Sequence, residues 1–251
     1  MLGRFILHLR EWSHAARSRF QIADHCDQIY YVPIWFQAIK NTTATKSGIN
    51  NLPMILSLVL FSMISGVAVT KLGYYTPWMI GSSIFMAIGA GLISTWEVGT
   101  LSNHWIGYQV VYGIGIGIGM QQALIAVQTV LPLKDIPIGT SIMNFCLTLG
   151  GALFISVGQN VFTNRLVSGV KTQAPNIPGE LVLGFGATNL RKEVLRRDPG
   201  SLYGVQKAYN DAIISAFYVS VAMAALSIFG STAMEWKSVK QEEKKVDATA
   251  V

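Results

Sequence analysis

The stretch GIGIGIGMQQ, residues 113–122, places four glycines at alternate positions in the middle of an uncharged run. Three structures have such a pattern: a loop that holds phosphate, a β-strand, or a helix that other helices approach closely. A dinucleotide fold needs G-x-G-x-x-G, and a phosphate loop needs G-x-x-x-x-G-K-[ST]. Neither spacing occurs here, and the next lysine is Lys134. Both nucleotide interpretations therefore fail.

The period of two suits a strand, but glycine is a poor strand residue, and strands rarely exceed about 10 residues. The uncharged run from Val98 to Leu133 has 36 residues, so a membrane-spanning helix remains. At 100° per residue, Gly113 and Gly117 lie on one face, and Gly115 and Gly119 on a roughly opposite one. Each pair is a small-xxx-small groove that admits a neighbouring backbone.

These glycines, with Gly150 and Gly151 of the next apolar run, have two interpretations. In the first, they only pack helices together. In the second, they also give flexibility to a helix that lines a transport pathway, so that this helix can bend. The sequence leaves both open.

The composition indicates a membrane protein. Of its 251 residues, 51% are hydrophobic and 13% are charged, and the mean hydropathy is +0.42, whereas a soluble domain carries about 25% charged residues. The charges flank five uncharged runs, each longer than the ~20 residues that cross about 30 Å of hydrocarbon. This pattern predicts an all-α polytopic membrane protein of about five helices. The expected spans are residues 52–70, 78–96, 105–131, 138–162 and 212–234.

Basic residues predict the orientation. The short loops at Lys71 and Lys134 lie on the same side as the charged tail, residues 235–251, so the C-terminus is expected in the cytoplasm. Residues 163–211 are then a long outside loop. Residues 1–28 hold four arginines and fit neither a signal peptide nor a span, so we expect a disordered lead-in or an interfacial helix.

Several other functional classes lack support in the sequence. The net charge of +6 comes from the ends of apolar runs and from loops, which suits an anionic membrane surface better than nucleic acid. No His, Cys, Asp and Glu cluster has metal-ligand spacing, so no metal is expected. Asn41-Thr42-Thr43 is a candidate glycosylation sequon on the side expected to be outside.

Polar side chains inside the expected spans are the candidate site. An unpaired amide in hydrocarbon costs several kcal/mol, so each must face protein or a wet cavity. They either line a cavity for amphipathic organic molecules or hold helices together by hydrogen bonds. The candidates are Tyr108, Gln109, Tyr112, Gln121, Gln122 and Gln128 in the third span, and Asn144, Gln159 and Asn160 in the fourth.

Titratable groups fall outside this set. No Asp, Glu, Lys, Arg or His lies within any of the five expected spans. A proton-coupled transporter needs such a group near its pathway, so any coupling residues are expected elsewhere.

GVAVTKLGYYTPW, residues 66–78, is similar to the loop signature G-x-L-A-D-R-x-G-R-K of the major facilitator superfamily. Gly66, Lys71 and Gly73 match, while Thr70 replaces the acid, so no charge relay is carried over. Further stretches resemble the fungal branch of fourteen-span drug:proton antiporters: YYVPIWFQAIK, SGINNLP, GYQVVYGIGIGIGMQQ, AVQTVLPLKDIPIGTSIMNF, LGGALFISVGQNVF and GATNLR.

This resemblance covers residues 29–234 and implies the C-terminal portion of an efflux pump, driven by the proton gradient with no other cofactor. Its partners would be the lipid bilayer, a small organic substrate and the missing N-terminal bundle, and its location the plasma membrane. With half a cavity, the chain alone is not expected to transport. The alternative is a non-transporting module that associates with a full-length transporter. A membrane-embedded enzyme ranks below both, because no nucleophile or acid–base pair is found in the spans.

Overall fold

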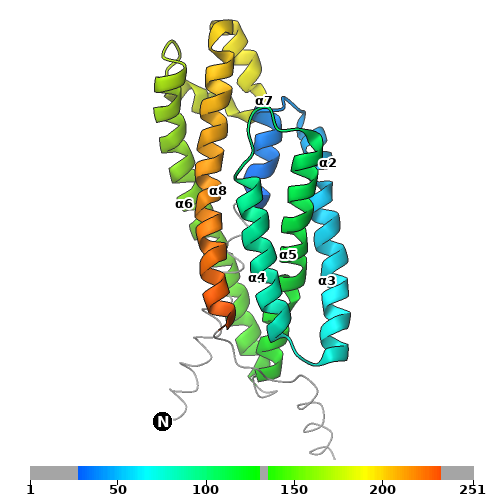
Figure 1. Cartoon of the computed structure of the whole chain (residues 1–251). Coiled ribbons are helices and arrows are strands. Elements are labelled where there is room, and N and C mark those ends of the chain that lie inside the picture. Colours follow the sequence, from blue (N-terminus) through cyan, green and yellow to red (C-terminus); the bar gives the residue numbers. More distant parts are fainter. Residues whose placement is uncertain (1–27, 131–134, 233–251) are drawn as a thin grey trace, which may run out of the picture.

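All the elements of the computed structural model are helices, and the model describes residues 28–130 and 135–232 (Figure 1). The lead-in before residue 28, Lys134 and the tail 235–251 lie outside the described residues. Residues 28–38 form a first helix. It is followed by α2 (Ala44–Asn50), α3 (Leu52–Leu72), α4 (Thr76–Ile93), α5 (Ser102–Val130), α6 (Ile136–Gln173), α7 (Gly179–Arg197), the 3-10 turn η1 (Pro199–Ser201) and α8 (Leu202–Thr232).

Five long helices stand where the five spans were expected, and they run alternately up and down, so the all-α class is confirmed (Figure 1). Their packing order differs from their chain order. Helix α5 lies between α3 and α4, α4 packs on α8, and α8 packs on α6. The lower ends of α3 and α8 are at one end of the bundle, and α7 is at the other.

Within the described part of the chain, four helical segments are long and apolar enough to cross a membrane. They are Leu52–Leu72, Thr76–Ile93, Ile136–Gln173 and Pro199–Ala225. Helix α5, some of whose side chains lie outside the described part, is not among the four. It is enclosed by two of them, however, since its glycine-rich middle is buried between α3 and α4.

Gly113, Gly115 and Gly117 of α5 face its two neighbours, as the helical interpretation predicts. A Cβ on Gly113 would collide with Met54 and Ser57 of α3, and one on Gly117 with Leu58 of the same helix. On the other face, a Cβ on Gly115 would lie 2.5 Å from the backbone nitrogen of Met86 in α4.

The α4 contact is close on both sides. A Cβ on Gly89 of α4 would lie 2.6 Å from Cα of Tyr112, and Ser82 Oγ donates a 2.7 Å hydrogen bond to the carbonyl of Gly115. Two opposed grooves therefore hold one helix between two others.

The loop that resembles the superfamily signature is a tight helix ending. Gly73 has φ 81° and closes α3, where its N–H donates to the carbonyl of Val69 at 2.7 Å. This left-handed conformation strains any residue with a Cβ, which explains the glycine. Lys71 is in the last turn of α3, while a Cβ on Gly66 would meet no atom within 4 Å.

Residues 163–211, expected as a loop, are mostly helical. Helix α6 has 38 residues and is about 57 Å long, well beyond the hydrocarbon thickness. The charges at Arg165 and Lys171 end the uncharged run but not the helix, because Leu166 and Val170 continue an apolar stripe that is buried against α8.

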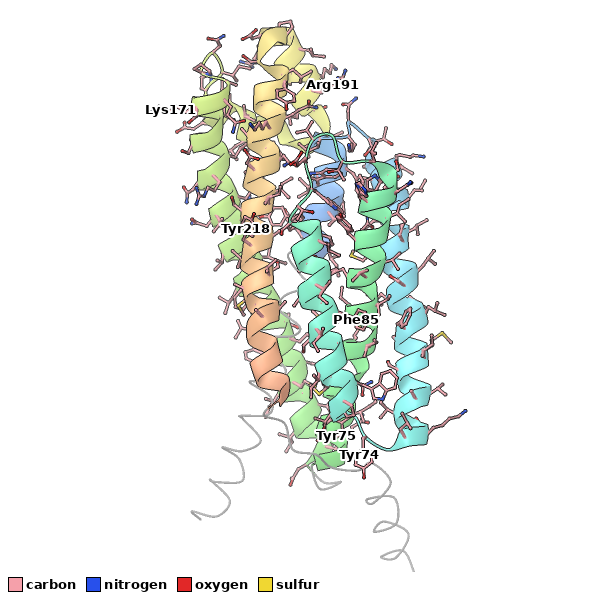
Figure 2. All side chains as sticks on the ribbon, in the orientation of Figure 1. Tyr74, Tyr75, Phe85, Lys171, Arg191 and Tyr218 are labelled. Atoms are coloured by element: carbon pink, nitrogen blue, oxygen red, sulfur yellow. The ribbon has the colours of Figure 1, made fainter. Side chains whose placement is uncertain are left out.

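Residues 166–208 form a folded cap, which consists of the upper ends of α6 and α8 with α7 and η1 between them (Figure 1). Its core contains Leu166, Val170, Ile177, Val182, Leu190, Val194, Val205 and Ala208. Gly186, with φ 65° and ψ 166°, divides α7 into two helical pieces. Labelled Lys171 and Arg191 lie at this end, opposite Tyr74 and Tyr75 (Figure 2).

Asp198 connects two turns of the cap. Its carboxylate accepts hydrogen bonds from Ser201 Oγ at 2.6 Å, Asn176 Nδ2 at 2.9 Å and the N–H of Gly200 at 3.1 Å. The Ser201 bond, followed by that of Asn176, lowers the pKa of Asp198 below its ordinary value.

Replacing Gly115 by alanine should destabilise the bundle. The added Cβ must displace the backbone of Met86, and overpacking of this kind costs about 1–3 kcal/mol. We expect a lower thermal midpoint in nanodiscs. Gly107→Ala in the same helix is the control, because a Cβ there meets no atom within 4 Å. Equal midpoints for the two variants would show that the α4–α5 contact is looser than described.

Acid should loosen the cap through Asp198. Because the pKa of this carboxyl is lowered on folding, its stabilisation is present above the unfolded pKa and is lost as the pH falls through the folded one. Hydrogen exchange of residues 174–201, corrected for intrinsic rates, should therefore rise below about pH 4. In Asp198→Asn this step should be absent. A wild-type profile that stays flat to pH 2 contradicts the assignment.

Candidate functional site

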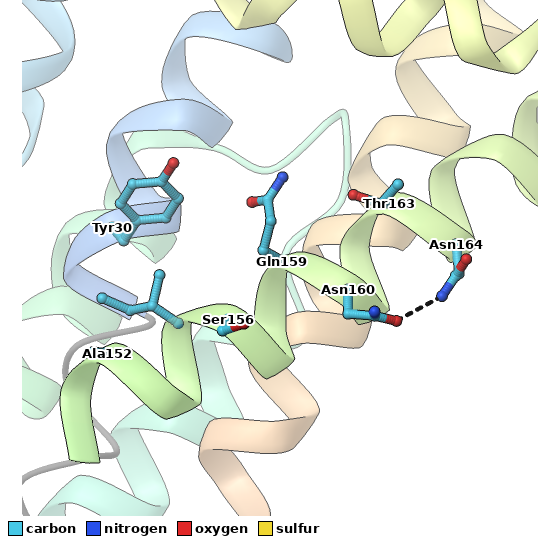
Figure 3. Close-up of a pocket in the computed structure, with 8 residues that line it drawn as sticks. Tyr30, Ala152, Ser156, Gln159, Asn160, Thr163 and Asn164 are labelled. Carbon is cyan, nitrogen blue, oxygen red and sulfur yellow. Dashed lines mark hydrogen bonds between the residues drawn. The ribbon is translucent and has the colours of Figure 1, made fainter. Parts of the chain in front are cut away.

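A pocket of about 540 Å³ lies on one face of α6, beside the start of helix 28–38 (Figure 3). Its α6 residues recur every three or four positions, which is the spacing of one helical face. The lining consists of Tyr30, Ala152, Ile155, Ser156, Gln159, Asn160, Thr163 and Asn164. Five of these eight side chains carry an amide or an aliphatic hydroxyl, and none is charged.

Hydrogen bonds orient the amides of the pocket. The hydroxyl of buried Tyr31 donates to Oε1 of Gln159 at 2.9 Å, and Nδ2 of Asn164 donates to Oδ1 of Asn160 at 2.7 Å. The ring of Tyr31 also packs edge-on against that of Tyr30, with centroids 5.0 Å apart. The pocket therefore combines one exposed aromatic ring with amides of defined orientation.

The predicted residues of α5 do not line this pocket. Gln109, Tyr112 and Gln122 are fully buried. Neither amide atom of either glutamine has a hydrogen-bond partner among the residues that the structure describes. Tyr108 is half-buried, and its ring stacks on that of His104 at 6.1 Å.

The remaining predicted residues are scattered. Gln128 and Asn144 are exposed, Gly151 is buried, Gly150 is half-buried, and the side chain of Gln121 lies outside the described set. The structure thus brings only Gln159 and Asn160 of the predicted polar residues into the pocket, while the role of the others stays a prediction. Asn41, the sequon residue, is exposed and has φ 52°.

Sequence reasoning missed four polar lining residues: Tyr30, Ser156, Thr163 and Asn164. The signal was present in SVGQNVFTN, residues 156–164, where hydroxyl and amide residues recur at helical spacing. It was hidden because the expected fourth span ended at residue 162, which placed Thr163 and Asn164 in a loop.

Next to the pocket, helix 28–38 is joined to the rest of the bundle by buried hydrogen bonds. Trp35 Nε1 donates to Oδ1 of Asn210 in α8 at 2.7 Å, and Nδ2 of Asn210 donates to the carbonyl of Trp96 at 3.1 Å. The rings of Trp35 and Trp96 are 4.6 Å apart. One amide therefore links helix 28–38, α8 and the segment after α4.

Lys40 secures the same end of the bundle. Its Nζ donates to the carbonyls of Val98 and Thr100 at 2.9 and 2.8 Å, and it lies 5.4 Å from the centre of the Trp35 ring. Partial burial lowers the pKa of this ammonium group. In addition, Thr188 of α7 donates to Gln37 at 2.6 Å, which attaches the cap to helix 28–38.

Comparison with known proteins identifies the family. The chain is 54% identical over 222 residues to "MFS-type efflux pump MFS1" of Trichophyton rubrum, a match that covers 88% of this chain and 40% of that protein. It is 52% identical over 213 residues to "Efflux pump roqT" of Penicillium rubens, which covers 85% and 39%. The chain belongs to the major facilitator superfamily. No protein-family model matches it.

A third fungal relative of the superfamily shows the same coverage. "MFS-type transporter astH" of Aspergillus oryzae is 49% identical over 237 residues, which is 94% of this chain and 42% of that protein. The chain therefore spans about 40% of the length of the curated relatives that it matches. Its helices form part of a major facilitator fold.

Replacing Asn210 by leucine should destabilise the bundle more than its size change suggests. The substitution leaves Trp35 Nε1 and the Trp96 carbonyl without their partner, and each unsatisfied buried group costs about 1–3 kcal/mol. We expect a lower thermal midpoint and faster proteolysis after residue 96. Gln206→Leu, which removes a longer 3.4 Å bond to the Ile39 carbonyl, is the control and should have a smaller effect. A thermal midpoint that falls further in Gln206→Leu than in Asn210→Leu would contradict the role of Asn210.

Proposed function

We propose that the chain forms the C-terminal membrane bundle of a proton-driven transporter that exports small organic molecules. The observation that carries this proposal is the 44–54% identity to fungal proteins named as efflux pumps and transporters, among them "Efflux pump aflT" of Aspergillus parasiticus. In this proposal the chain acts as a transporter component and not as an enzyme.

The bundle has features that suit such a role. Helix α5 is fixed between α3 and α4 through glycine contacts, so these three helices would move as one body. Helix α6 presents a polar wall, the pocket described above, on a face that is largely exposed. Transporters of this superfamily bind substrate between two bundles. We propose that this wall contributes one side of that cavity and that an N-terminal bundle contributes the other.

Orientation and energy coupling belong to the same proposal. The loop with Lys71 would lie in the cytoplasm together with the C-terminus, and the cap would lie outside a plasma membrane. Long connections of this kind cross the membrane largely regardless of their charge. Because no Asp, Glu, Lys, Arg or His lies within the five expected spans, the proton would bind to residues of the N-terminal bundle.

A chimera tests the proposal. The part of the Penicillium rubens relative that precedes its matched region is fused to this chain and expressed in a yeast strain without its own drug exporters. We expect the fusion to lower the intracellular level of a fluorescent dye, and a protonophore to abolish the effect. The chain alone, expressed to the same level, is the control and should not change dye retention. Dye retention that is unchanged by a correctly folded fusion would contradict the proposal.

A further inference from the structure

The α6 pocket has a chemical character that goes beyond a general transport pathway. Among its eight lining residues the hydrogen-bonding groups are amides and hydroxyls, and no carboxylate, ammonium or guanidinium group lines it. A site without charge gives a charged ligand no counter-ion in return for its lost hydration, so it favours neutral ligands.

The hydrogen bonds inside the pocket determine which groups it offers. Because Tyr31 occupies Oε1 of Gln159, the Nε2 of that amide is left as a donor. Because Asn164 occupies Oδ1 of Asn160, the Nδ2 of Asn160 is a second donor. Neither the Gln159 amide nor the Asn160 amide makes another side-chain hydrogen bond to the described part of the chain. Two donors on adjacent residues suit a ligand that carries carbonyl oxygens.

An aromatic surface lies beside these donors. Tyr30 is 46% exposed, and Figure 3 shows Gln159 standing between its ring and Thr163, with the amide directed away from α6. The Tyr30 ring packs at right angles to that of Tyr31, with the centroids 5.0 Å apart. A flat ring system can therefore stack on Tyr30 while its carbonyl oxygen accepts from Gln159.

The depth of the pocket is also defined. Phe162 is next to the upper residues of the pocket, and its ring centroid lies 5.2 Å from that of Tyr209 in α8. Asn210, which follows Tyr209, donates to the carbonyl of Trp96 just beyond the end of α4. The lowest residue of the pocket, Ala152, is about 24 Å along α6 from the start of that helix at Ile136. The pocket thus lies toward the cap end of α6, in the second half of the expected span 138–162 and just beyond it.

We propose that Tyr30, Gln159 and Asn160 form a binding site for uncharged, planar aromatic compounds that carry carbonyl groups, toward the cap end of α6. The site rests on the proposed function, and it assigns that function a substrate class. Gln159 and Asn160 provide the hydrogen bonds, and Tyr30 provides the stacking surface.

Equilibrium binding to the chain in nanodiscs tests the site without transport. The probes are the neutral 7-amino-4-methylcoumarin, the cationic rhodamine 6G and the anionic fluorescein, each followed by fluorescence anisotropy with empty nanodiscs as blank. We expect the coumarin to bind most tightly. Gln159→Ala should weaken it about 2- to 12-fold, as expected for one hydrogen bond, and Gln159→Ala with Asn160→Ala should weaken it further.

Two further variants sharpen the test. Thr148→Ala removes an exposed hydroxyl of the same helix outside the pocket and should leave the coumarin affinity unchanged. Gln159→Glu keeps an acceptor for Tyr31 but adds a negative charge, so rhodamine 6G should gain affinity while the coumarin loses it. Coumarin that binds no better than the charged probes, or that binds the double variant as tightly as the wild type, overturns the site.

The two proposals fail separately. A chimera that exports no dye, combined with coumarin binding that depends on Gln159, refutes transport and supports the site. Export by the chimera, combined with binding that ignores Gln159 and Asn160, refutes the site and leaves transport standing.

Discussion

The close approach of α5 to two neighbouring helices is the contact on which the bundle depends. Helices in lipid gain little from burying apolar side chains, because lipid tails are equally apolar, so close backbone packing and interhelical hydrogen bonds must hold them together. Gly113 and Gly117 admit the backbone of α3, and Gly115 admits that of α4. The Ser82 hydroxyl of α4 also donates a hydrogen bond to the Gly115 carbonyl.

This packing divides the bundle into two parts that differ in how closely their helices pack. The α3, α4 and α5 unit is tight through its middle, whereas α6 joins the bundle mainly through α8 and contacts α5 little. The two parts are connected by the packing of α4 on α8 and, at the cap end, by the buried hydrogen bonds that Trp35, Asn210 and the Trp96 carbonyl share. A polar wall can therefore lie on α6 without disturbing the helix packing.

Much of the fold could be predicted from the sequence, because lipid restricts the choice. A chain that crosses hydrocarbon must satisfy its own backbone, so long uncharged runs become helices. The glycine period then gives the two packed faces of α5. The helix ends were less predictable. Arg165 and Lys171 interrupt the uncharged run, yet α6 continues to Gln173 because Leu166 and Val170 pack against other helices of the cap, and a count of charges does not detect such amphipathic packing.

The site was harder to predict, for a related reason. Polar residues in a span have the same residue types whether they line a cavity or face another helix, and only the position of neighbouring helices separates the two. Gln109 and Gln122 are enclosed because α5 is the central helix, while Gln159 is exposed because α6 lies at the edge of the packing order. Tyr30 joins the pocket from more than 100 residues away. In a single sequence, Gln109 and Gln159 lie in equivalent apolar runs. The glycines of α5 make it the central helix of its three-helix unit, so Gln109 is an interior amide. Gln159, on a helix at the edge of the packing order, is part of a pocket wall.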